Sequence, residues 1–133
     1  MTAKVFSYSV QIQQTYLDMF NHVNNATYLT LFEEARWHFL NSNGYGIKKI
    51  QETSLGPTIL EINLKFLKEL RLHDNIIIET QLISYDKKTG ILSQKMLRQN
   101  EVCCTAEFVI GLFDLKERKL ILPTPEWLSV LGI

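Results

Sequence analysis

Residues 26–40 predict a helix that is apolar around most of its circumference. At about 100° per residue, five polar residues fall in one narrow stripe, namely Thr27, Thr30, Glu34, His38 and Asn41. Leucine, alanine and aromatic side chains fill most of the remaining surface. Such a helix is covered by protein on most sides and does not lie on a surface. Residues 41–46, "NSNGYG", end it with the Asn and Gly residues typical of helix C-termini.

The rest of the chain predicts strands joined by short turns. Residues 5–13 alternate between apolar and polar side chains, as in a half-buried strand. Further strands are expected at residues 58–67, 75–85, 91–99, 102–114 and 120–122, and a short helix at residues 126–131. Consecutive strands with short turns favour an antiparallel sheet. The single long helix must then cover one face of that sheet. We therefore expect one α+β domain over residues 1–133.

Composition excludes some classes of function. The chain has 14 basic and 14 acidic residues and a net charge of +0, which disfavours duplex nucleic acid as the main partner. We find neither a signal-peptide pattern nor an apolar run long enough to cross a bilayer, so we expect a cytoplasmic protein without membrane insertion. Cys103 and Cys104 are adjacent and have no second Cys/His pair to share a metal, so we expect reduced thiols.

A crowd of polar residues, "DMFNHVNN" over residues 18–25, precedes the helix. The first N–H groups of a helix have no internal partners and attract negative charge, including an oxyanion that forms in a transition state. Asp18 lies close enough in sequence to fold back toward that helix end. A carboxylate and an N–H-lined helix end are the minimal parts for hydrolysing a thioester, whose thiolate leaves without being protonated.

Structural interpretations of the same residues stay open at this point. An aspartate near a helix start is more often a cap or a loop hydrogen-bonder than a catalyst. Asn24 and Asn25 are good capping residues, and a lone His22 is more often a loop histidine. In the helix, Arg36 falls within the apolar arc, and we expect it to form an ion pair with Glu33, three residues earlier.

Residues 18–36 resemble a known family. Their pattern matches D-x-x-G-H-V-N-N-x-x-Y-x-x-x-x-E-x-A-R, which is typical of hotdog-fold acyl-CoA thioesterases of the 4-hydroxybenzoyl-CoA thioesterase type. Looser similarity extends over nearly the whole chain. The resemblance implies a long antiparallel sheet wrapped around one central helix. It also implies an acyl-CoA substrate, no metal or other cofactor, and a homodimer or homotetramer with active sites at the subunit interface.

The resemblance also implies roles for particular residues. Asp18 corresponds to the acid that attacks the thioester carbonyl or activates water, and backbone N–H groups around Asn24 and Asn25 correspond to the oxyanion hole. His22 is a further catalytic candidate. The residues expected to bind substrate are Asn24, Tyr28, Lys87, Lys88, Lys116 and Arg118, of which the last four correspond to nucleotide-binding turns. Basic residues in turns are also ordinary solvated side chains.

Two positions depart from the family pattern. Asn21 replaces the usual glycine, and Asn tolerates positive φ better than most residues. Phe20 stands where the similar acyl-carrier-protein thioesterases, with D-x-N-x-H-V-N-N, have an asparagine. A phenyl ring cannot orient water, which argues against that acid–Asn–His mechanism. Two alternatives remain, a thioesterase acting on acyl-carrier protein and a non-catalytic module that binds acyl-CoA. The sequence does not indicate the acyl chain.

Overall fold

An antiparallel sheet of order β1-β3-β4-β5-β2, to which β6 is added by pairing with β5, is the main layer of the protein. The computed structural model describes residues 2–133. Its elements are β1 (Val5–Gln11), the 3-10 turn η1 (Gln14–Tyr16), α1 (Asn25–Ser42), α2 (Ile47–Thr53), β2 (Leu55–Phe66), β3 (Asn75–Asp86), β4 (Thr89–Arg98), β5 (Glu101–Asp114), β6 (Lys119–Ile121) and α3 (Pro125–Val130).

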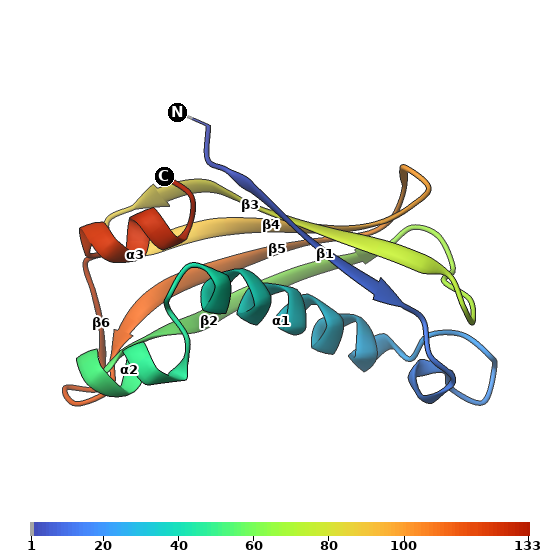
Figure 1. Ribbon diagram of the computed structural model, residues 1–133, viewed down its shortest axis with the longest axis horizontal. Helices are drawn as coiled ribbons and strands as arrows, with labels where there is room; N and C mark the ends of the chain where they lie inside the picture. Colours follow the sequence, from blue (N-terminus) through green and yellow to red (C-terminus); the bar gives the residue numbers. More distant parts are fainter. Residues whose placement is uncertain (1) are drawn as a thin grey trace.

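Helix α1 lies along one face of this sheet and forms the core with it (Figure 1). Leu31 and Phe32 are fully buried, and the Phe32 ring meets Phe108 of β5 edge-on, with 6.0 Å between ring centroids. Each such side chain contributes roughly 2 kcal/mol by leaving water. The polar stripe of the helix faces outward as predicted. The α+β hotdog architecture, with a sheet around one central helix and a short C-terminal helix, is therefore confirmed.

The predicted strands are all present, with ends that differ by a few residues. Helix α2 was not predicted. It is only seven residues long, its N-cap Gly46 supplies no capping side chain, and it has too few turns for a clear helical period. Ile50 holds it against the start of β2, where a Cβ on Gly56 would lie 3.4 Å from the Ile50 side chain.

One side of α1 is less covered than the sequence predicts. Leu29 and Trp37 are only partly buried. The neighbouring strand β2 is an edge of the sheet, and its Leu60 and Ile62 side chains are 47% and 46% exposed. Apolar side chains therefore remain open on α1 and on the adjacent edge strand β2.

The predicted ion pair between Arg36 and Glu33 is wrong. Arg36 instead donates from Nη1 to Oε1 of Gln94, at 2.9 Å, and its guanidinium lies 4.4 Å from the Phe108 ring centroid. Gln94 is fully buried on β4 and also donates to the carbonyl of Phe32. The cation therefore finds its partners in the sheet, while Glu33 points to solvent. Burial lowers the pKa of Arg36 to about 10, so the side chain stays charged near neutrality.

The two cysteines are free and both are buried. Burial raises the pKa of the Cys104 thiol to about 12, so it is not a thiolate near neutral pH. None of the helices within residues 2–133 is both long and apolar enough to cross a bilayer.

Candidate active site

A cleft opens where α1 begins, at the end of the molecule opposite α2 and α3 (Figure 1). It encloses a cavity of about 360 Å³. One wall comes from the loop before α1 and its first turns, and the other from the end of β2 and the segment after it. The lining residues are Asp18, His22, Val23, Asn24, Asn25, Tyr28, Phe66, Leu67, Lys68 and Glu69. Every residue predicted from the motif before α1 therefore lines one cleft.

Asp18 is held by the turn that it helps to form. Its Oδ1 accepts hydrogen bonds from the backbone N–H groups of Phe20, at 2.9 Å, and His22, at 3.4 Å. The Asp18 N–H in turn donates to the His22 carbonyl at 2.8 Å. Asn21 has φ of 61°, which confirms that it takes the positive-φ place of the usual glycine. Asp18 is thus the loop hydrogen-bonder that the structural interpretation of the sequence expected, while its second carboxylate oxygen remains available for chemistry.

The start of α1 leaves one N–H group open. The side-chain oxygen of Asn24 accepts from the N–H of Ala26 at 2.9 Å, which makes Asn24 the N-cap. The Asn24 N–H donates to the Tyr16 carbonyl, and the Thr27 N–H donates to the Asn24 carbonyl. Among the residues that the structure describes, the N–H of Asn25 has no hydrogen-bond partner. Of the two asparagines in the predicted oxyanion hole, only Asn25 offers a free backbone donor.

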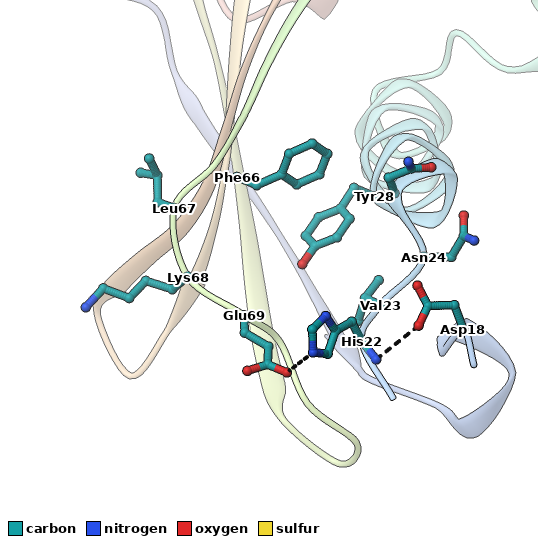
Figure 2. Close-up of a pocket in the computed structure, with 10 residues that line it drawn as sticks. Asp18, His22, Val23, Asn24, Tyr28, Phe66, Leu67, Lys68 and Glu69 are labelled. Atoms are coloured by element: carbon teal, nitrogen blue, oxygen red, sulfur yellow. Dashed lines mark hydrogen bonds and ion pairs between the residues drawn. The ribbon is translucent and has the colours of Figure 1, made fainter. Parts of the chain in front are cut away.

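Tyr28 carries its hydroxyl into the cleft, on the side that faces His22 and Glu69 (Figure 2). Its ring is buried and meets Phe66 of β2 edge-on, with 4.9 Å between centroids. Burial raises the pKa of Tyr28 to about 12, so the phenol keeps its proton near neutrality. The group can donate a hydrogen bond to a bound ligand.

His22 reaches across the cleft to the opposite wall. Its Nε2 lies 2.9 Å from Oε1 of Glu69, while its backbone N–H is the group that bonds Asp18 (Figure 2). Glu69 follows β2 in the segment between β2 and β3 and was not predicted as a site residue. It is 47 positions from His22 in sequence, so no local pattern could pair the two. Phe66, Leu67 and Lys68 were missed for the same reason.

Phe20 does not take part in the cleft. Its side chain is 71% exposed and is not among the lining residues. The loop therefore offers no side chain in place of the asparagine of acyl-carrier-protein thioesterases.

The four basic turn residues lie away from Asp18 within one chain. Lys87 and Lys88 are in the turn between β3 and β4, and Lys116 and Arg118 are in the turn between β5 and β6. Both turns are at the end of the molecule that carries α2 and α3 (Figure 1). A single chain therefore does not bring the four residues to the cleft.

The fold and the cleft together define a hotdog-fold protein with an acid and a free N–H at the start of its central helix. The model of the thioesterase-like superfamily matches residues 12–131. The long-chain acyl-CoA thioesterase FadM of Escherichia coli (strain K12) is 32% identical over 114 residues, which are 84% of this chain and 86% of that protein.

Solved structures agree with this relationship. The probable thioesterase YbaW from Escherichia coli superposes with a TM-score of 0.86 at 27% identity, covering 96% of this chain and 99% of that one. SAV2348 from Staphylococcus aureus, determined in complex with CoA, has the same fold, with a TM-score of 0.88 at 20% identity over 98% of this chain and 83% of that one. The chain belongs to the thioesterase-like superfamily and is a thioester hydrolase.

Proposed function

We propose that the chain hydrolyses acyl-CoA to a free carboxylic acid and CoA, with the Asp18 carboxylate as nucleophile or general base. One observation carries the proposal. The Asp18 carboxylate, with Oδ1 fixed by two backbone N–H groups, lines the same cleft as the unpartnered N–H of Asn25. The similarity to FadM supports an acyl-CoA substrate.

The reaction can proceed from Oδ2 of Asp18 in two ways. As a nucleophile, Oδ2 adds to the thioester carbonyl, the C–S bond breaks, and CoA leaves as a thiolate. The resulting acyl–Asp18 anhydride is then hydrolysed by water. As a general base, Oδ2 takes a proton from water while the water oxygen adds to the same carbonyl, and the thiolate leaves from the tetrahedral intermediate. In both forms the N–H of Asn25 donates to the carbonyl oxygen as it becomes negative.

The substitution Asp18→Asn tests the proposal. Asparagine keeps an oxygen that can accept from the N–H groups of Phe20 and His22, so the turn should persist. We expect kcat/KM for acyl-CoA to fall by roughly 10²- to 10⁴-fold, with an unchanged melting temperature. A panel of short, long, branched and aromatic acyl-CoAs serves as substrate. Wild-type turnover by this variant on every member of the panel would sink the role of Asp18.

Two controls separate the remaining alternatives. Matched thioesters of CoA and acyl-carrier protein distinguish the two substrate classes. A higher kcat/KM for the carrier-protein ester would show that acyl-carrier protein, and not CoA, carries the substrate. A module that only binds acyl-CoA would show a measurable Kd without turnover, and Asp18→Asn would leave that Kd unchanged.

A homodimer is also part of the proposal. The open strip along α1 and β2 consists of Leu29, Trp37, Leu60 and Ile62, and β2 is an unpaired edge of the sheet. Exposed apolar edges of this kind are normally covered by a partner. A second copy related by a two-fold axis would cover the same strip on both chains.

This dimer gives the basic turns a role. Strand β2 runs from Leu55, beside the turn after β5, to Phe66 at the cleft. If β2 pairs antiparallel with β2 of a second copy, the Leu55 end of one chain lies beside the Phe66 end of the other. The turns with Lys87, Lys88, Lys116 and Arg118 of one subunit would then approach the cleft of the other. Four cations suit the phosphates of the CoA nucleotide.

A further inference from the structure

We propose that His22, positioned by Glu69, is the base that activates the hydrolytic water for the acyl–Asp18 anhydride. The inference rests on the proposed function in its nucleophilic form. It assigns Glu69 as a positioning residue and gives the contact between His22 and Glu69 across the cleft a role in the reaction.

The contact between the two side chains decides which ring nitrogen can accept a proton. Nε2 of His22 lies 2.9 Å from Oε1 of Glu69. A carboxylate only accepts hydrogen bonds, so Nε2 must carry a proton in this contact. In neutral His22 the other nitrogen, Nδ1, therefore holds the free lone pair. Figure 2 shows that nitrogen on the side of the ring toward the Tyr28 hydroxyl, within the cleft.

Two arginines contact Glu69. Nη1 of Arg98 donates to the backbone carbonyl of Glu69 at 2.9 Å, and the same group pairs with Asp74 at 2.9 Å. Nη2 of Arg71 lies 3.4 Å from the second carboxylate oxygen of Glu69. The backbone and both carboxylate oxygens of Glu69 thus have partners. The residue is fixed more firmly than a lone surface ion pair, which by itself contributes little.

The cleft needs a second acceptor if Asp18 is the nucleophile. Oδ1 of Asp18 already accepts from two N–H groups, and Oδ2 is consumed when the anhydride forms. The other titratable side chains lining the cleft are Tyr28, Lys68 and Glu69. Tyr28 keeps its proton, Lys68 is a cation paired with Glu101, and Glu69 is paired with His22. Nδ1 of His22 is the acceptor that remains.

The step balances without any further reactant. Nδ1 of His22 takes one proton from water as the water oxygen adds to the acyl carbonyl of the anhydride. The bond between that carbonyl carbon and Oδ2 breaks, which releases the carboxylic acid and restores the Asp18 carboxylate. His22, now an imidazolium, faces the Glu69 carboxylate and returns its proton to solvent. This is the arrangement by which a carboxylate orients and supports a histidine base.

Pre-steady-state release of CoA tests the proposal. In Glu69→Ala we expect the first equivalent of CoA to appear as fast as in wild type, followed by a steady state at least about 10-fold slower. His22→Gln should show the same burst with a larger loss. Glu69→Gln keeps an oxygen acceptor and should recover part of the steady rate. ¹⁵N NMR of His22 should report a proton on Nε2 in neutral wild-type protein and a tautomer mixture in Glu69→Ala.

A matched control and the contrary outcomes complete the test. Glu79 forms a partly exposed ion pair with Lys95 elsewhere on the sheet, so Glu79→Ala should leave both phases unchanged. Loss of the burst in Glu69→Ala, or a steady rate within twofold of wild type, would overturn the inference. Neither outcome touches the proposed function, whose failure would appear instead as full activity in Asp18→Asn.

Discussion

At the scale of single residues, Asp18 combines a structural role with the chemical role proposed for it. Asp18 closes the turn before α1 with one oxygen and presents the other to the cleft. Asn24 caps the helix, and this cap consumes the N–H groups of Ala26 and Thr27. The N–H of Asn25 is thereby left as the free donor. The oxyanion hole predicted around Asn24 and Asn25 is thus narrowed to one backbone N–H group.

Removing that single N–H is possible without disturbing the helix. Asn25 is the first residue of α1, a position that favours proline. The preceding Asn24 has φ of −58° and ψ of 139°, a conformation that a following proline accepts. We expect Asn25→Pro to lower kcat by roughly 10²- to 10³-fold, the loss typical of one oxyanion donor.

Asn25→Ala is the matched control, because it removes the side chain and keeps the N–H. It should retain activity close to wild type. If Asn25→Ala were as damaged as Asn25→Pro, the side chain and not the backbone would carry the role. Circular dichroism and melting curves check that α1 is intact in both variants.

At the scale of elements, local patterns predict more than long-range pairings do. The helical spacing of apolar residues in α1, the alternation in β1 and the cluster of polar residues before the helix could all be recognised in the sequence, because each lies within one short segment. The His22–Glu69 contact and the partner of Arg36 could not be predicted in this way, because Glu69 is 47 residues from His22 and Gln94 is 58 residues from Arg36. The Glu33 prediction failed because helical spacing brings Glu33 near Arg36 but cannot show that a sheet amide lies closer.

The segment between β2 and β3 depends on one ion pair. Burial alone would raise the pKa of Asp74, but the Arg71 N–H and the Arg98 guanidinium outweigh it, and the pKa falls below its usual value. A carboxyl with a lowered pKa in the folded state stabilises the protein above its unfolded pKa. That contribution is lost as the pH falls through the folded value.

We therefore expect Asp74→Asn to be less stable than wild type by roughly 1–2 kcal/mol at about pH 7. The difference should shrink toward zero as the pH falls through the lowered pKa of Asp74, because the wild-type carboxyl then becomes protonated as well. Urea unfolding across this range measures it. A difference that stays constant with pH would show that shape and not charge is responsible. Arg98, the partner of Asp74, also donates to the Glu69 carbonyl. We therefore expect Asp74→Asn to lower the steady-state rate of CoA release, measured under conditions in which the variant is fully folded.

At the scale of the whole molecule, the residues predicted to form the site lie in two separated parts of one chain. The carboxylate, the free N–H and the His22–Glu69 pair gather at one end, and the basic turns gather at the other (Figure 1). The family resemblance predicted both the cleft residues and the basic turn residues, but it did not show that they lie at opposite ends of one subunit. The open strip along α1 and β2 explains how two copies would reunite them, because a two-fold axis exchanges the ends.

Mixing inactive subunits tests this arrangement. One variant is Asp18→Asn, and the other carries Lys87→Ala and Lys88→Ala, which should weaken nucleotide binding. In a heterodimer with shared sites, one cleft combines the intact Asp18 with the intact lysines of the other chain. Random exchange of equal amounts should restore about a quarter of wild-type activity at low substrate.

The controls use the edge strand itself. Ile62→Lys, on β2, should give a monomer in light scattering and should abolish the recovery in mixtures. Val5→Lys, on the opposite edge strand β1 with the same exposure of 46%, should change neither. If mixed subunits gained no activity while still exchanging, each cleft would have to bind the nucleotide with residues of its own chain. The basic turns would then be ordinary solvated loops.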